Sequence, residues 1–262
     1  MIVIFFLWKD QGNLKEGEKI MSKSIFDPNS NEPYVLSRSR VYNFIDCPRC
    51  FYLTQRLGIK KPDSYPFNLN LAVDQLLKNE FDGYRKKQEP HPIQVENNLN
   101  AIPYEHPELD NWRESLRNGV KRYHEPTNLL LRGGIDDVWI DKKTNQLIVV
   151  DYKATSKKGE VGISADWQDG YRKQIEFYQW LFRGNSFDVS DTGYFVYCNG
   201  IKDKAEFNNK LEFKVKLIPY IGNDQWVEPT LLDLKNCLLA EEPPQAEEDC
   251  SYCRYITKSL TV

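Results

Sequence analysis

An aspartate and a lysine close one apolar segment of this 262-residue chain. The segment LIVVDYKAT, residues 147–155, begins with four branched or apolar residues, as a strand inside a sheet does. Because side chains alternate along a strand, Asp151 and Lys153 point to the same face. The pattern predicts a central strand that ends in a charged site.

A second carboxylate is expected to face Asp151. The preceding segment LLLRGGIDDVWI is predicted to be a strand, joined to LIVVDYKAT through DKKTNQ in a hairpin. With an even number of loop residues, as when Ile140 pairs with Leu147, Asp136 lies across from Asp151. An odd number would place Asp137 there instead.

Two opposed carboxylates repel each other unless a cation lies between them. Mg²⁺ or Mn²⁺ suits such an oxygen-rich site, and either ion also accepts water and phosphate oxygens as ligands. Lys153 would then orient a water nucleophile or stabilise charge on a phosphoryl group. The alternative interpretation is a strand-end ion pair between Asp151 and Lys153.

The order of three motifs resembles the PD-(D/E)XK nucleases, and in particular the RecB-type nuclease domains and the CRISPR-adaptation exonucleases. The motifs are GID (134–136), DYK (151–153) and QIEFY (174–178). The resemblance implies a restriction-endonuclease-like fold, Mg²⁺-binding aspartates, an assisting lysine and a Gln-x-x-x-Tyr helix that lines the site. In this sequence those catalytic roles fall on Asp136, Asp151, Lys153, Gln174 and Tyr178.

A third metal ligand is less clearly marked. That branch of the family usually carries a histidine on the helix before the strands, whereas LAVDQLLKNEF offers Asp74 at the matching place. An aspartate can bind Mg²⁺, so the predicted metal ligands are Asp74, Asp136 and Asp151. Glu80 on the same helix is the alternative third ligand.

Four of the six cysteines form two Cys-x-x-Cys pairs, Cys47 with Cys50 and Cys250 with Cys253. This spacing is typical of a four-thiolate site that joins distant parts of a chain. Spacing alone does not choose between a [4Fe–4S] cluster and tetrahedral Zn²⁺. The resemblance favours iron–sulfur, but relatives usually place one cysteine early and three late, so zinc is the alternative.

Other residues that commonly bind metals lack such spacing. Cys198 lies in an apolar predicted strand and Cys237 on a predicted helix, and both are expected in the core. The three histidines are assigned no role: His91, His106 and His124.

Helical periodicity predicts four helical regions, at residues 37–58, 69–87, 166–182 and 228–242. The first would form one or two segments, and the last would precede the second cysteine pair. The apolar stripe expected for the second region is Leu69, Val73, Leu76, Leu77, Phe81 and Tyr84. The stripe expected for the third is Trp167, Tyr171, Ile175, Tyr178 and Phe182.

Strands are predicted at 192–200 and 211–220 in addition to the hairpin, and the region 89–128 receives no assignment. This order implies an α/β fold with a mixed central sheet flanked by helices. We expect a single nuclease domain at 21–262. Its catalytic core would cover about 69–200, and its four-cysteine cap would come from 37–58 and 245–256.

The composition, 40% hydrophobic and 28% charged, is typical of a globular protein. No apolar run is long enough to span a membrane, and the N-terminus lacks the features of a signal peptide, so a cytoplasmic protein is expected. Residues 1–20 are predicted to be a non-native or disordered leader, with translation starting at Met21. The net charge of −3 gives no bulk sign of nucleic-acid binding, although a local basic groove remains compatible with it.

The predicted function is Mg²⁺-dependent hydrolysis of DNA phosphodiester bonds. By resemblance the protein would act on DNA ends or single strands in repair, recombination or CRISPR adaptation, with a helicase or integrase as a conceivable partner. The alternative is a nucleic-acid-binding subunit or metal-stabilised interaction module without turnover. Basic residues that could contact DNA are Arg38, Arg40, Lys157, Lys158, Arg172 and Lys173, of which the pair after Lys153 is favoured.

Overall fold

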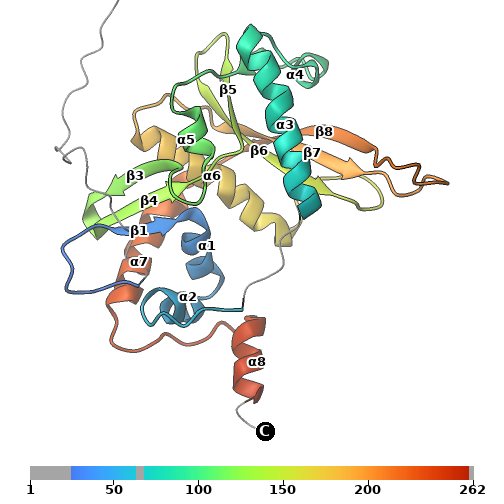
Figure 1. Cartoon of the computed structure of the whole chain (residues 1–262). Coiled ribbons are helices and arrows are strands. Elements are labelled where there is room, and N and C mark those ends of the chain that lie inside the picture. Colours follow the sequence, from blue (N-terminus) through green and yellow to red (C-terminus); the bar gives the residue numbers. More distant parts are fainter. Residues whose placement is uncertain (1–24, 63–67, 260–262) are drawn as a thin grey trace, which may run out of the picture.

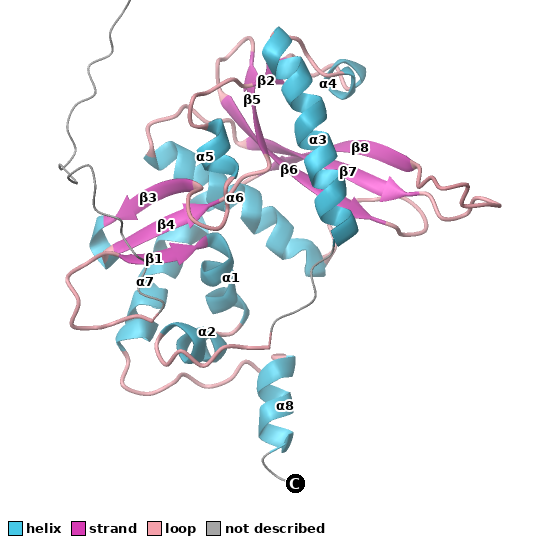
Figure 2. Ribbon diagram, in the orientation of Figure 1, coloured by secondary structure: helices cyan, strands magenta, loops and turns pink. Residues whose placement is uncertain are grey.

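A computed structural model describes residues 25–62 and 68–259 of the chain (Figure 1). The predicted leader and the predicted start at Met21 lie outside these residues. The elements form a mixed α/β fold with two sheets and surrounding helices (Figure 2), as expected from the sequence. None of the helices in the described ranges is long and apolar enough to cross a membrane.

The larger sheet has the strand order β2-β5-β6-β7-β8. Its β6–β7 pair is parallel and the other neighbouring pairs are antiparallel, so the predicted mixed sheet is confirmed. Strand β6 is buried from Leu147 to Tyr152, because it has a strand on each side and helices above and below. The strands are β2 (Ala101–Pro103), β5 (Asp137–Asp141), β6 (Leu147–Thr155), β7 (Thr192–Gly200) and β8 (Phe213–Ile221).

Two helices cover opposite faces of this sheet: α3 (Asn68–Lys87) and α6 (Asp169–Gly184). Phe81 of α3 shares a core cluster with Ile148 of β6. Ile175 of α6 shares another with Val149, the next residue of the same strand. Alternation along β6 therefore separates the two cores, and it directs Asp151 and Lys153 to the face of α6.

The predicted helical stripes are only partly buried. Leu77 and Phe81 pack in the core under the sheet, whereas Leu69 and Leu76 are exposed, because they lie outside the side of α3 that packs there. Trp167 is exposed as well, contrary to the prediction. It precedes α6 in a 3₁₀ turn, where the helical spacing does not apply.

The hairpin register predicted from an even loop is confirmed. Ile140 of β5 pairs with Leu147 of β6, and six residues, 141–146, connect them. However, the prediction of one strand through LLLRGGIDDVWI is wrong, because β4 ends at Gly133 and β5 begins at Asp137 in another sheet. The break is tight: a Cβ on Gly134 would lie 2.6 Å from the Ser115 Cβ.

The smaller sheet has the order β1-β4-β3, with β1 parallel to β4 and β3 antiparallel to it. Part of it comes from the region that the sequence left unassigned. Its strands are β1 (Tyr34–Ser37), β3 (Val120–His124) and β4 (Leu129–Gly133). The short helices of the same region are α4 (Pro92–Glu96) and α5 (Leu109–Arg113).

Helices from the two ends of the described chain lie together below the smaller sheet (Figure 1). The first predicted helical region divides at Cys47, where the backbone is extended and Pro48 starts a new helix. The region 228–242 is not the last helix, since α8 follows it. The helices are α1 (Arg38–Asp46), α2 (Pro48–Gln55), α7 (Val227–Leu239) and α8 (Ser251–Ser259).

Candidate active site and cysteine cluster

Asp151 is a fully buried carboxylate on β6 that forms an ion pair with Lys153. Within the described part of the chain, neither of its oxygens has a hydrogen-bond partner of normal geometry. Burial raises the pKa of Asp151 to about 7; the Lys153 ammonium opposes this rise and Asp136 adds to it. A buried carboxylate is costly unless a cation and hydrogen bonds complete it, so these oxygens fit a metal ion.

Asp136 lies in the bend just before β5. Continuing the β5–β6 register by one pair places it opposite Asp151. Its Oδ2 accepts a hydrogen bond from the Tyr152 backbone N–H at 2.8 Å, and its carbonyl accepts one from Arg113 Nε at 3.1 Å. Both the backbone and one carboxylate oxygen of Asp136 are therefore fixed at the end of β6.

Asp137 occupies the opposite face. It is fully buried, forms ion pairs with Arg85 and Arg113, and accepts a hydrogen bond from the Tyr152 hydroxyl at 2.8 Å. Its pairing partner on β6 is Val150, which belongs to the core beneath α3. Two guanidinium groups neutralise this carboxylate, so Asp137 stabilises the fold and Asp136 is the aspartate at the site.

A chain of hydrogen bonds joins Lys153 to the bend before β5. Lys153 Nζ donates to Gln174 Oε1 at 3.4 Å, and Gln174 Nε2 donates to the Tyr178 hydroxyl at 3.2 Å. That hydroxyl donates to the Gly134 carbonyl at 2.6 Å. The four-residue spacing puts both α6 side chains on one helix face. A Cβ on Gly133 would lie 2.5 Å from the Tyr178 ring, so this close approach requires glycine.

The Lys153 ammonium also lies over the Tyr171 ring, 4.8 Å from its centroid. Burial by itself would lower the pKa of Lys153, but the Asp151 and Asp136 carboxylates outweigh it and raise that pKa above its ordinary value. The side chain is therefore a cation held by two carboxylates, an amide and an aromatic face.

The two candidates for the third ligand lie in different surroundings. Asp74 borders the same cleft as Asp136 and Lys153, and burial together with the Asp136 charge raises its pKa. Lys78 Nζ lies 2.8 Å from Asp74 Oδ2. Glu80 instead contacts His91, with 2.8 Å between Oε1 and Nε2. Asp74 is thus the one of the two that shares the cleft.

The cleft has a volume of about 350 Å³ and lies between the first turns of α3 and α6 at the end of β6. Of the residues that the structure describes, only the four paired cysteines bring three or more metal-ligand atoms within 4.8 Å of one another. A cation bound between Asp136 and Asp151 would compete with the ion pair between Asp151 and Lys153.

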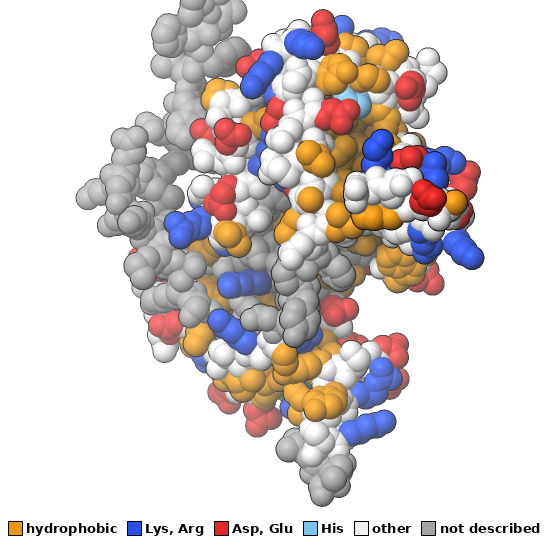
Figure 3. Space-filling model, turned by 45° about the vertical axis from the view of Figure 1, so that its right-hand side comes forward, with side chains coloured by type: hydrophobic (Ala, Val, Ile, Leu, Met, Phe, Trp, Pro, Cys, Tyr) orange, Lys and Arg blue, Asp and Glu red, His pale blue; other side chains and the backbone are white. Residues whose placement is uncertain are grey.

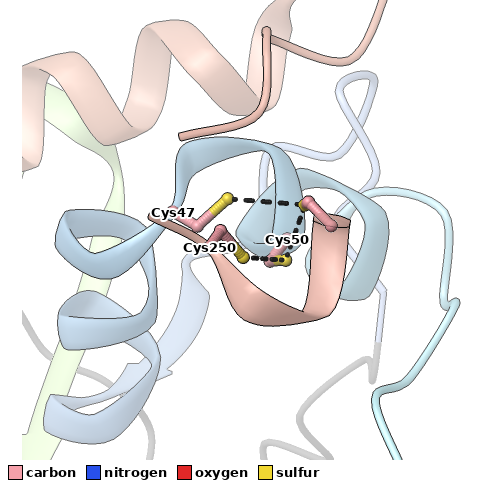
Figure 4. A group of neighbouring side chains, drawn as sticks. Cys47, Cys50 and Cys250 are labelled. Atoms are coloured by element: carbon pink, nitrogen blue, oxygen red, sulfur yellow. Dashed lines mark hydrogen bonds between the residues drawn. The ribbon is translucent and has the colours of Figure 1, made fainter. Parts of the chain in front are cut away.

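The two Cys-x-x-Cys pairs converge, as predicted (Figure 4). Cys47 and Cys50 lie at the start of α2, and Cys250 and Cys253 lie at the start of α8. Cys47 Sγ is 3.8 Å from Cys253 Sγ, and Cys50 Sγ is 3.6 Å and 3.4 Å from those of Cys250 and Cys253. The four sulfur atoms lie within 4.8 Å of one another and could together bind a metal centre.

The remaining cysteines lie apart from this cluster. Cys198 and Cys237 are buried, in agreement with the prediction that they belong to the core. The three histidines have structural partners that the sequence did not reveal, and His106 stacks on Trp112 with 4.2 Å between the ring centroids. His91 caps α4 and stacks on Phe81, and His124 Nε2 lies 2.6 Å from Glu228 Oε2.

The predicted DNA-contacting residues have different environments. Arg38 lies close enough to Asp151 for its charge to lower the pKa of that carboxyl. Arg172 and Lys173 both pair with Asp169 on their own helix, and Arg172 also donates to backbone carbonyls. The remaining candidates are exposed or half-exposed: Arg40, Lys157 and Lys158.

Arg85 and Arg113 were not predicted from the sequence. Both pair with Asp137, and Arg113 also donates to the Asp136 carbonyl. Arg113 falls in the region that received no assignment, and Arg85 is at the end of α3. One signal was available: a second aspartate inside a buried strand requires a cation from elsewhere in the chain. Which residue provides that cation is decided by tertiary packing.

Comparison with known protein families agrees with this geometry. The sequence model for the PD-(D/E)XK nuclease superfamily matches residues 35–257. No curated protein matches the chain. Among the matching solved structures is "Crystal structure of SSO0001", with 17% identity, a TM-score of 0.37, and coverage of 87% of this chain and 86% of that one.

Proposed function

The chain belongs to the PD-(D/E)XK nuclease superfamily, and from this premise we propose that it is a metal-dependent deoxyribonuclease. Asp136 and Asp151 would bind Mg²⁺ or Mn²⁺, with Asp74 as the third carboxylate. Lys153 would act on the scissile phosphate. Gln174 and Tyr178 would keep the lysine in place.

One observation carries this proposal. Asp151 is fully buried, and its oxygens lack normal hydrogen bonds to any residue that the structure describes. The ammonium of Lys153 lies against it at the edge of a cleft. A strand-end ion pair on the surface would be hydrated and worth little. Burying this pair costs free energy, and buried charged groups of this kind are concentrated at catalytic sites, here one that would act on a phosphodiester.

Lys153, Gln174 and the aspartates would have different roles in catalysis. Lys153 Nζ would donate a hydrogen bond to the attacking water or to a non-bridging phosphoryl oxygen, where negative charge develops. Gln174 restricts the position of the ammonium by accepting one of its hydrogen bonds. A metal ion bound by the aspartates would neutralise further charge on the phosphoryl oxygens.

The experiment incubates purified protein with end-labelled single- and double-stranded DNA, with Mg²⁺, with Mn²⁺ and with chelator. We expect metal-dependent cleavage, and Lys153→Ala should reduce its rate by about 10²- to 10³-fold. Lys142→Ala, an exposed lysine at the far end of the same hairpin, is the control and should cleave normally. Binding of DNA without cleavage under any metal would instead support a binding module without turnover.

For the cysteine cluster we propose a single tetrahedral Zn²⁺ ion. With Zn–S bonds of about 2.3 Å, tetrahedral geometry separates neighbouring sulfur atoms by roughly 3.8 Å. Three of the six Sγ separations are 3.4, 3.6 and 3.8 Å, close to that value, and all four sulfur atoms lie within 4.8 Å of one another. A four-iron cluster holds its thiolates farther apart because the cluster itself lies between them, so the spacing favours zinc over the iron–sulfur centre that the family resemblance implies.

Metal analysis and the visible spectrum test this assignment. We expect colourless protein with about one zinc ion per chain, and Cys50→Ser should reduce that content. The core cysteine variant Cys198→Ala is the control and should keep its zinc. Brown protein with broad visible absorbance and matching iron and sulfide would decide for [4Fe–4S].

The family resemblance extends the proposal to DNA ends or single strands as substrates, in repair, recombination or CRISPR adaptation. Comparing circular with linear DNA in the same assay separates cleavage from ends from internal cleavage. The resemblance also makes a helicase or integrase a reasonable partner to test.

A further inference from the structure

Trp167 is the most exposed tryptophan in the described part of the chain. Its side chain is 68% exposed, whereas Trp112, Trp139 and Trp180 are buried and Trp226 is half-buried. Placing a large indole in water forfeits the free energy that its burial would contribute. Because tryptophan is enriched at binding interfaces, this exposed indole is a candidate contact for a partner molecule.

The turn that carries this indole, η2 (Asp166–Gln168), is firmly braced. The buried Gln168 side chain accepts a hydrogen bond from the Ala165 N–H at 3.1 Å and donates to the Gly162 carbonyl at 2.6 Å. Arg172 Nη1 donates to the Ala165 carbonyl at 3.0 Å. The backbone on which Trp167 stands is thus ordered before any ligand binds, which lowers the entropy cost of binding.

Trp167 is connected to the candidate active site through one aromatic ring. Its own ring lies edge-on to Tyr171, with 5.8 Å between the centroids. Tyr171 lines the cleft, and Lys153 Nζ lies 4.8 Å from its ring. The exposed indole is therefore two contacts from the ammonium that would act on the scissile phosphate.

Trp167 belongs to the segment that connects β6 to α6, residues 156–168, and this segment carries two positive charges near its start. Lys157 and Lys158 follow β6 directly and are exposed. The backbone of Lys157 is fixed to the Asn199 side chain by hydrogen bonds of 2.9 and 3.1 Å. On the face shown in Figure 3, by contrast, Lys and Arg are intermixed with Asp and Glu and form no large basic area. Lys157 and Lys158 would supply two local positive charges to a strand bound at this connection.

We propose that Trp167 is a stacking platform for a nucleobase of a single-stranded substrate next to the cleft. This inference rests on the proposed nuclease function. The chemistry is that of a flat, rigid aromatic face, which binds any base without reading its sequence. A base inside a duplex already has neighbours on both faces, so the platform selects a single strand or a frayed end over a closed circular duplex, which has no ends.

Binding measurements with no added divalent metal test the platform without consuming the strand. Fluorescence anisotropy with labelled oligo-dT should show Trp167→Ala binding about 5- to 100-fold more weakly than the wild type. Trp167→Phe should retain most of the affinity because it keeps an aromatic face. Phe207→Ala, an exposed aromatic in the β7–β8 connection, is the control and should bind normally. Equal binding by Trp167→Ala and the wild type overturns the proposal.

A strand with one abasic position provides the sharper test. Moving that position along the oligonucleotide should reveal one place where the missing base weakens wild-type binding. In Trp167→Ala the same place should make no difference, because the base has already lost its partner. An equal loss of affinity for relaxed, closed circular duplex and for single strand in Trp167→Ala overturns base stacking.

The outcomes separate this inference from the nuclease function. If Trp167→Ala binds normally while Lys153→Ala loses cleavage, the stacking platform is wrong and the nuclease assignment stands. If the wild type neither binds nor cleaves any DNA, both fail.

Discussion

Lys153 lies between two groups that constrain it in different ways. The Asp151 carboxylate attracts it by charge, and Gln174 Oε1 accepts a directed hydrogen bond from it. Gln174 is in turn held by Tyr178, whose hydroxyl donates to the Gly134 carbonyl. The hydroxyl of Tyr178 therefore links the lysine to the backbone next to Asp136. Removing this hydroxyl would shift Lys153 and Asp136 while leaving the charge of each unchanged.

Tyr178→Phe tests this link at the residue scale. The variant should be destabilised by about 1 kcal/mol, because the Gly134 carbonyl loses its donor. The cleavage rate at saturating DNA should also fall by roughly tenfold or more, because Gln174 and Lys153 lose their anchor. Single-turnover kinetics and thermal unfolding measure the two effects separately.

A matched variant separates positioning from stability. Tyr52 is also buried, and its hydroxyl donates to the Ala240 carbonyl at 3.0 Å, outside the cleft. Tyr52→Phe should lose similar stability and keep full activity. If Tyr178→Phe behaves like Tyr52→Phe in both measurements, Tyr178 has a structural role only.

At the scale of elements, the sequence predicted the central hairpin well because its signals are local. Branched apolar residues define β6, and the six-residue connection fixes the pairing of Ile140 with Leu147. Alternation then places Asp151 and Lys153 on one face without further information. The same local signals placed Gln174 and Tyr178 on one face of α6. The core of the candidate site was therefore predictable.

The elements that were mispredicted depend on distant parts of the chain. LLLRGGIDDVWI reads as one strand because it is apolar on both sides of the glycine pair. It breaks there because β4 pairs with β1 and β3 in a second sheet, while β5 pairs with β2 and β6. The close contact of Gly134 with Ser115 could not be read from spacing.

Trp167 shows the same limit for a single side chain. Its spacing from Tyr171 matches a buried helical stripe, yet the residues before α6 form a 3₁₀ turn and turn the indole outward. Leu69 and Leu76 of α3 also match the predicted apolar stripe, yet they are exposed while Leu77 is buried. Periodicity predicts which face is apolar, but tertiary contacts decide whether anything covers it.

At the scale of the whole molecule, the cysteine cluster joins two parts of the chain that are 200 to 206 residues apart in sequence. Cys47 and Cys50 lie at the start of α2, while Cys250 and Cys253 lie at the start of α8. Cys253 is the one buried residue of α8 in the described chain. This helix therefore has little apolar contact of its own, and the shared metal centre is what would hold it in place.

Removing the metal should release α8 and leave the nuclease core folded. In Cys253→Ser we expect loss of the metal and exchange of the α8 amide protons at rates near those of an unprotected chain, since Cys253 is the buried residue of this helix in the described chain. Hydrogen exchange followed by mass spectrometry measures it for residues 251–259. The amides of β6 should keep their protection, because the strand is buried between its neighbours and two helices.

Cys237→Ala is the matched control, since Cys237 is a buried cysteine on α7 outside the cluster. It should lower the melting temperature through a small cavity while retaining the metal and the protection of α8. Persistent protection of α8 in metal-free Cys253→Ser would show that packing, and not the metal centre, fixes this helix. A loss of protection that extended into β6 would show that the cluster stabilises the entire fold.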